Sequence, residues 1–193
     1  RADSLPRPEV RDAAGYSLTR ARIRVLSAST PQKALEFFLG EQQNPKSVGN
    51  LGTDYGIALV RMQLGEYGAA RDLFQSLRAA HPGTIPFHTG LANAELTLGN
   101  KSQALSIYDQ AMALFPRNVP LTVRYAEALL ANGDAKKAHN ILLDLLNNVP
   151  PTAQQVRLIA LAARAAGDTA EAHYYMAEMP LIKGDATMAA DQL

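Results

Sequence analysis

The sequence predicts an all-α fold in which antiparallel helix pairs stack into a solenoid. The main observation is an internal period of 34 residues, because a fixed period of this length is the sequence signature of a repeat architecture. Glycine, proline and alanine all recur with this period. Glycine makes up only about 7% of the residues of average proteins, so chance does not explain its recurrence. The recurring residues are Gly65, Gly99, Gly133 and Gly167; Pro82, Pro116 and Pro150; Ala58, Ala92, Ala126 and Ala160; and Ala70, Ala104, Ala138 and Ala172.

Each unit of 34 residues is expected to form a helix, a turn and a second helix. The stretch Leu51–Leu64 ends at Gly65, and glycine accepts the positive φ found just beyond helix C-termini. An acidic or amide residue follows each glycine and can cap the next helix. A proline then closes each unit, since it cannot continue a helix. The predicted capping residues are Glu66, Asn100, Asp134 and Asp168.

The second helices carry one apolar face each, because their apolar residues follow the spacing i, i+3, i+4, i+7. Alanine at the start of each series lets two helix backbones approach closely. Such faces must be buried against a neighbouring helix pair. The four faces are Ala70, Leu73, Phe74 and Leu77; Ala104, Ile107, Tyr108 and Ala111; Ala138, Ile141, Leu142 and Leu145; and Ala172, Tyr175, Met176 and Met179.

The ends of the chain depart from the regular period. Residues 1–15 are expected to be a linker, and residues 16–45 a divergent leading repeat with helices at Tyr16–Leu26 and Gln32–Gly40. Regular repeats are expected at 51–84, 85–118, 119–152 and 153–184, followed by a truncated final helix at 185–193. Because the chain begins with Arg1 rather than Met, we expect it to be part of a longer protein.

Composition excludes several functional classes. The chain has 193 residues, no cysteine and a net charge of +1, so thiolate metal sites and global attraction to nucleic acid are not expected. No apolar run is long enough for a membrane span. The densest basic cluster, Arg20, Arg22 and Arg24, is better explained as a solvated face than as a phosphate or RNA site.

No catalytic, cofactor-binding or metal-binding residue is predicted. None of the four histidines pairs with another at i, i+4, and the HExxH, GxSxG, Walker and dinucleotide motifs do not occur in the sequence. An enzymatic function is therefore the least favoured of the alternatives, and no cofactor is expected within this sequence.

Six residues of the first regular unit in this period of 34 resemble the tetratricopeptide-repeat (TPR) pattern. They are Ala58, Gly65, Tyr67, Ala70, Phe74 and Pro82. The resemblance covers residues 51–184 and implies a right-handed superhelix, an α-solenoid whose first helices line a concave groove that binds protein or peptide. By position, the groove residues would be Tyr55, Leu59, Met62, Gln63, Thr89, Asn93, Leu96, Thr97, Val123, Glu127, Leu130, Arg157, Leu161 and Arg164.

A clamp for a chaperone's terminal carboxylate, as some TPR co-chaperones have, is disfavoured. Asn93 matches one position of such a clamp, but Thr89 and Pro120 stand where basic residues would be required.

Several short segments resemble the C-terminal TPR region of the β-barrel assembly-enhancing protease family, periplasmic zinc metalloproteases with an N-terminal HExxH domain. The segments are Arg1–Pro6, Tyr16–Leu26, Thr30–Phe38 and Ala170–Lys183 followed by Gly184-Asp185. The resemblance implies a docking and regulatory domain in outer-membrane protein quality control, with zinc only in a protease domain outside this sequence. Its partners would be the β-barrel assembly machinery or its substrates, in the periplasm of a Gram-negative bacterium.

The alternative is a free-standing TPR scaffold or co-chaperone that binds a linear peptide, in the cytoplasm.

The alanine series generates a test of the predicted register. We expect Ala92→Phe and Ala126→Phe each to lower the free energy of unfolding, because overpacking a close helix contact costs about 1 to 3 kcal/mol. Thermal unfolding followed by circular dichroism measures the effect. Unchanged melting temperatures in both variants would contradict the register.

Overall fold

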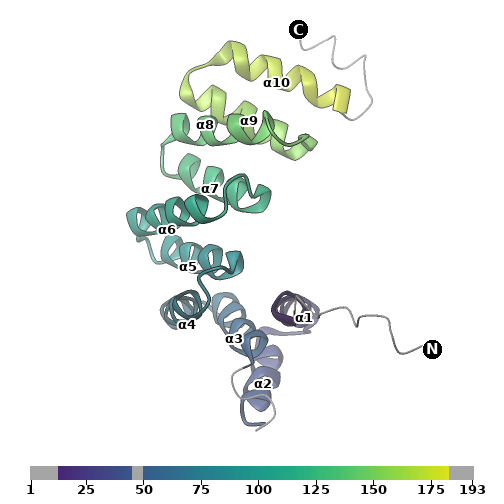
Figure 1. The fold of residues 1–193 in the computed structure, drawn as a ribbon, viewed down its shortest axis with the longest axis vertical. Helices are drawn as coiled ribbons and strands as arrows, with labels where there is room; N and C mark the ends of the chain where they lie inside the picture. Colours follow the sequence, from purple (N-terminus) through teal and green to yellow (C-terminus); the bar gives the residue numbers. More distant parts are fainter. Residues whose placement is uncertain (1–12, 45–49, 183–193) are drawn as a thin grey trace, which may run out of the picture. The chain divides into compact units, whose positions relative to one another are not determined.

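The structure is a computed structural model that describes residues 13–44 and 50–182, and these residues form ten helices and no strand (Figure 1). The predicted all-α fold is therefore confirmed. The helices are α1 (Ala13–Ser27), α2 (Pro31–Gln42), α3 (Leu51–Gln63), α4 (Tyr67–Ala80), α5 (Ile85–Thr97), α6 (Lys101–Leu114), α7 (Val119–Ala131), α8 (Ala135–Leu146), α9 (Ala153–Ala166) and α10 (Thr169–Ile182).

The chain divides into two compact units, Arg1–Ala94 and Glu95–Leu193. In the first unit, α3 is the central helix and contacts α1, α2 and α4. In the second unit, consecutive helices from α6 to α10 contact each other, and α7 also contacts α9. Each predicted regular repeat therefore contains two observed helices. The predicted final helix at 185–193 lies outside the described residues.

The first helix begins earlier than predicted. Ala13–Gly15, assigned to the linker, belong to α1. The apolar pattern begins only at Tyr16, but alanine has the highest helix propensity and extends a helix without contributing to such a pattern. At α2 the predicted signals are correct, since Thr30 caps the helix by accepting a hydrogen bond from the Lys33 amide and Pro31 occupies the first turn.

The four periodic glycines all end a first helix in the left-handed conformation, with φ between 78° and 93°. At Gly133, the glycine N–H donates to the Leu130 carbonyl (3.1 Å) and the Asp134 N–H to the Leu129 carbonyl (2.9 Å). These two bonds form a Schellman motif, which satisfies carbonyls that would otherwise lack a partner at the helix end. The same pair of bonds recurs at the other three glycines.

The residues after these glycines follow the prediction in only two of four repeats. Asp134 and Asp168 cap the next helix through their side chains. Glu66 and Asn100 make no side-chain cap. Instead, Glu66 pairs with Arg61, and Asn100 donates to the Glu95 carboxylate (2.6 Å). Both therefore bind the preceding helix, because a charged partner there makes a stronger hydrogen bond than a backbone amide does.

The predicted alanine contacts form the centre of the core. Ala58, Ala92 and Ala126 have no exposed surface. Glycine serves the same purpose at Gly90, where a Cβ atom would collide with the ring of Phe74. Small residues thus allow aromatic side chains to fill the space between helices.

A polar cluster of three residues joins α6, α7 and α8. The Tyr125 hydroxyl donates to Asp109 Oδ1 (2.6 Å), and Lys137 Nζ donates to both oxygens of the same carboxylate (2.9 and 3.0 Å). Tyr125 also stacks on Tyr108. Burial and the hydrogen bond to Asp109 raise the pKa of Tyr125 to about 12. The hydrogen bonds to Tyr125 and Asp109 raise the pKa of Lys137 as well.

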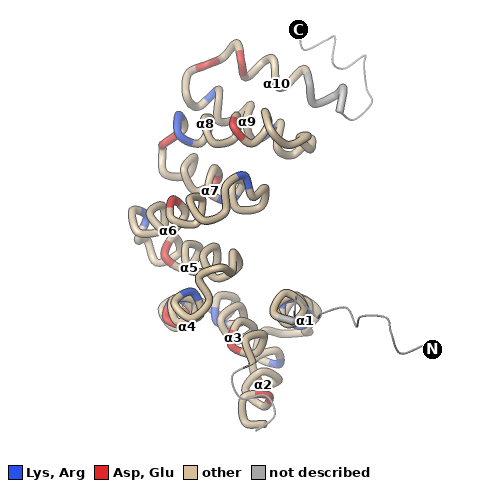
Figure 2. Tube along the Cα trace, in the orientation of Figure 1, with Lys and Arg blue, Asp and Glu red and all other residues tan. Residues whose placement is uncertain are grey.

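Charged residues of both signs are interspersed along the helices, as the near-zero net charge predicts (Figure 2). Among the helices of the described segments, none is long and apolar enough to cross a membrane.

The left-handed glycines generate a stability prediction. We expect Gly133→Ala to lower the free energy of unfolding by about 1 kcal/mol or more, because an L-residue is strained at positive φ. Gly68→Ala is the matched control: both sites have open space for a Cβ, but Gly68 lies within α4 with a helical φ, so alanine should be neutral or stabilising. Urea unfolding measures both, and equal effects would contradict the argument.

The raised pKa of Tyr125 predicts a pH dependence of stability. An unfolded tyrosine loses its proton at the ordinary value of 10.0, whereas folded Tyr125 keeps it to about 12. The folded state therefore binds more protons across this window, and the stabilisation that is complete below pH 10 is lost as the pH rises through 12. We expect Tyr125→Phe to reduce this loss, measured by urea unfolding at several pH values. An unchanged pH profile would argue against the assignment.

Candidate functional site

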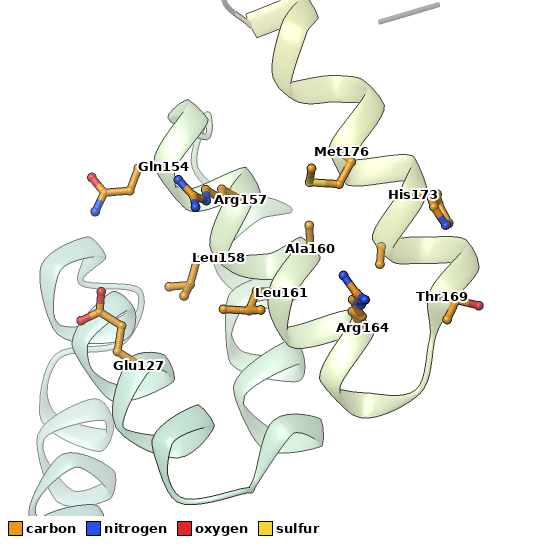
Figure 3. A pocket seen from close by; sticks show the side chains of 11 residues that line it. Glu127, Gln154, Arg157, Leu158, Ala160, Leu161, Arg164, Thr169, His173 and Met176 are labelled. Carbon is orange, nitrogen blue, oxygen red and sulfur yellow. The ribbon is translucent and has the colours of Figure 1, made fainter. Parts of the chain in front are cut away.

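A pocket of about 730 Å³ lies between α7, α9 and α10, within the second unit (Figure 3). Its volume falls in the range of about 300 to 1,000 Å³ that is typical of ligand sites. One lining residue comes from α7, six from α9 and four from α10. They are Glu127; Gln154, Arg157, Leu158, Ala160, Leu161 and Arg164; and Thr169, Ala172, His173 and Met176.

The α9 wall is a stripe of alternating charge and apolar surface. Arg157, Leu161 and Arg164 follow the spacing i, i+4, i+7, which places all three on one face of the helix. Leu161 is 56% exposed, and it lies between the two arginines along the helix (Figure 3). A leucine this exposed within a pocket is available for contact with another molecule.

The α10 wall adds a second apolar group. Ala172 is buried while Met176 is 36% exposed, and the Met176 side chain extends toward α9 (Figure 3). Ala160 faces the same space from α9 and is almost fully buried. Because the side chains of Ala160 and Ala172 are small, they leave open the space that the larger lining residues surround.

The charges of the pocket are unevenly placed. Arg157 and Arg164 on α9 are exposed, and among the described residues neither guanidinium has an ion-pair partner. Glu127 stands on α7, on the other side of Leu158 from Met176 (Figure 3). The pocket therefore has positive charge along α9 and one negative charge at its α7 edge.

Two sets of interactions hold the walls in place. The start of α9 has a capping box, in which Thr152 and Gln155 each bond the other's backbone amide. On α10, Glu171 accepts a hydrogen bond from the Tyr175 hydroxyl (3.0 Å) and lies 3.2 Å from His139 Nε2 of α8, without the geometry of a hydrogen bond to that nitrogen. The buried Ala172 and Tyr175 complete the contact of α10 with the core.

Four of the predicted groove residues meet in this pocket, namely Glu127, Arg157, Leu161 and Arg164. Of the others, nine are exposed or half-buried but lie outside it. In the first unit these are Leu59, Met62, Gln63, Thr89 and Asn93, and in the second Leu96, Thr97, Val123 and Leu130.

Tyr55 was predicted to line the groove, and this placement is wrong. Its side chain is only 5% exposed, and its ring lies 6.2 Å from that of Phe74 and 5.7 Å from that of Phe87. Aromatic pairs at these distances stabilise a core. The absence of a side chain at Gly90 makes room for the Phe74 ring, against which Tyr55 packs.

Sequence reasoning missed the contribution of α10. Met176 was expected to be core, and second helices were not expected to face the groove. The signal in the sequence is that Thr169, Ala172, His173 and Met176 follow the i, i+3, i+4, i+7 spacing, a face adjacent to the predicted apolar one. Gln154, Leu158 and Ala160 were missed on α9.

A smaller pocket of about 360 Å³ lies among α1, α2 and α3, lined in part by Arg20, Arg24 and Phe37. The Arg24 guanidinium lies 3.9 Å from the centre of the Phe37 ring, a cation–π contact. Within the described parts of the chain, no three histidine or acidic side chains are arranged to hold a metal ion.

Family models described as tetratricopeptide repeat match residues 55–118 and residues 96–162. Together they span the regular repeats from α3 to α9. No curated protein matches the chain.

Solved structures with low sequence identity to the chain share its fold. MamA from Desulfovibrio magneticus RS-1 has a TM-score of 0.69 at 14% identity, covering 91% of this chain and 98% of its own. A thermophilic TPR protein from Thermus thermophilus has a TM-score of 0.65 at 19% identity, covering 92% of this chain and 97% of its own. YrrB, described as a TPR protein with an unusual peptide-binding site, has a TM-score of 0.62 at 17% identity, covering 92% of this chain and 91% of its own. The chain therefore contains a tetratricopeptide-repeat domain.

Proposed function

We propose that this chain binds a segment of another protein, and that the pocket between α7, α9 and α10 is a principal contact. TPR domains bind proteins or peptides, and this pocket gathers four of the residues predicted to line a first-helix groove. The observation that carries the proposal is the exposure of Leu161 and Met176 toward one concave space between two arginines.

The energetic argument rests on the apolar part of the pocket. Fully burying a leucine or methionine side chain contributes about 1.5 to 3 kcal/mol. Leu161 and Met176 are each partly exposed before binding. A partner side chain that covers both therefore contributes part of this burial free energy to binding. The surrounding arginines, glutamate and glutamine supply orientation through hydrogen bonds, as in many binding pockets.

At a finer level, we propose the docking and regulatory domain of a periplasmic zinc metalloprotease that acts in outer-membrane protein assembly and quality control. Its partners would be the β-barrel assembly machinery or its substrates, and the catalytic zinc would belong to a separate domain. The support is the resemblance of the leading segments, Tyr16–Leu26 and Thr30–Phe38, to that family. These segments correspond to α1 and α2.

The gene sequence upstream of Arg1 tests this finer proposal. An HExxH domain in the same reading frame supports it. A start codon close to Arg1 would instead favour a free-standing TPR scaffold or co-chaperone.

The binding proposal predicts that pocket variants lose affinity. A phage-displayed random peptide library panned on the intact chain supplies peptides, whose affinities are measured by fluorescence anisotropy. We expect Leu161→Ala combined with Met176→Ala to weaken the selected peptides at least about tenfold, a loss of about 1.4 kcal/mol, because both side chains lose their apolar contact.

Leu114→Ala is the matched control, since Leu114 is 57% exposed, as Leu161 is at 56%, but lies on α6 outside the pocket. Circular dichroism verifies that all variants remain folded. Equal affinities for the pocket variant and the wild type would contradict the proposed contact.

A further inference from the structure

We infer that the pocket between α7, α9 and α10 selects an extended segment in the polyproline II conformation, with two acidic side chains three residues apart and an apolar residue between them. The inference rests on the proposed peptide-binding function and specifies its ligand. It is argued from the spacing of Arg157, Leu161 and Arg164 along α9.

The spacing of the arginines sets the spacing of the acids. Arg157 and Arg164 are separated by seven residues of helix, which is a rise of about 10 Å at 1.5 Å per residue. A polyproline II segment has three residues per turn and rises about 3.1 Å per residue, so residues three apart lie on the same face, about 9 Å apart. A segment that runs along α9 can therefore place one carboxylate at each guanidinium.

The apolar position follows from the same stripe. Leu161 lies four residues after Arg157 and three before Arg164, near the midpoint between them. Its exposed side chain, with Leu158 on one side and Met176 on the other, lines the space between the two guanidinium groups (Figure 3). In a polyproline II segment the two residues between the acids point to either side of the face that carries the acids, so an apolar residue there lies against Leu158 or Met176 beside Leu161.

Charge complementarity identifies the ligand as acidic. Arginine presents a planar set of donors that matches a carboxylate in two parallel hydrogen bonds. Within the described residues, the guanidinium groups of Arg157 and Arg164 have no carboxylate partner in an ion pair. Glu127 at the α7 edge repels a further acid there, so a ligand with acids at the two arginines is favoured over a uniformly acidic one.

The conformational preference of short peptides favours a polyproline II segment over a helix. Isolated helices shorter than about 12 to 15 residues are marginal in water. Polyproline II is a major conformer of unfolded chains, so a short linear segment can enter the pocket without first forming a helix.

Short fluorescein-labelled peptides test the inference by anisotropy with the intact chain. The reference peptide carries Glu-Leu-Ala-Glu between neutral glycine and serine flanks. Comparison peptides carry Gln-Leu-Ala-Gln, the adjacent acids of Leu-Glu-Glu-Ala, or the apolar-free Glu-Ser-Ser-Glu. A helical peptide with glutamates seven residues apart represents the alternative occupant. We expect the reference to bind at least about tenfold more tightly than each of the others.

Protein variants assign the effect to the two arginines. We expect Arg157→Gln with Arg164→Gln to remove the preference for Glu-Leu-Ala-Glu over Gln-Leu-Ala-Gln. Arg117→Gln with Lys136→Gln changes the net charge equally but lies outside the pocket, so it should retain the preference. Arg157→Glu with Arg164→Glu should reverse it and favour Lys-Leu-Ala-Lys.

The outcomes separate this inference from the proposed function. Equal binding of the acidic and amide peptides, or tighter binding of the helical or adjacent-acid peptide, overturns the inference. If peptides selected from the library still depend on Leu161 and Met176, the binding function stands without it. If no peptide depends on these residues, both fail. Sedimentation that shows dimers dissociated by Leu161→Ala would make a second copy the occupant and also overturn the inference.

Discussion

The left-handed glycine turn between the two helices of each repeat is the constraint on which the rest of the structure depends. The glycine ends the first helix and the second helix begins two residues after the glycine, while two carbonyls at the end of the first helix gain hydrogen bonds. The turn therefore fixes which face of each helix meets its neighbour. Only with that register do Ala126 and Ala138 fall in the buried interface, and only then is the α9 face that carries Arg157, Leu161 and Arg164 left exposed.

The elements set by backbone chemistry were predictable from the sequence. The glycine period identified every first-helix end from α3 to α9, because positive φ is a demand that glycine meets and most residues do not. Thr30 with Pro31 likewise identified the start of α2. These signals are local, so they can be recognised without knowledge of the rest of the fold.

Features that depend on tertiary contacts were not predictable in the same way. Tyr55 and Leu59 lie four residues apart on the same helix, yet Tyr55 is buried because Phe74 and Phe87 receive its ring. Glu66 occupies a capping position but binds Arg61. Met176 belongs to a core pattern but opens into the pocket beside α9. Each outcome was decided by a residue distant in sequence or by competition between two partners, which a single-chain pattern does not encode.

The placement of one pocket wall on α10 couples ligand affinity to the stability of that helix. Single helices can open locally at a free-energy cost below that of global unfolding. When α10 opens, Met176 and Ala172 leave the pocket, so the apparent dissociation constant equals the intrinsic one divided by the fraction of molecules in which α10 is closed. By reciprocity, an occupied pocket holds α10 closed. The contact between Glu171 of α10 and His139 of α8 lies outside the pocket. A change in this contact alters the stability of α10, and thereby the ligand affinity, without touching the ligand.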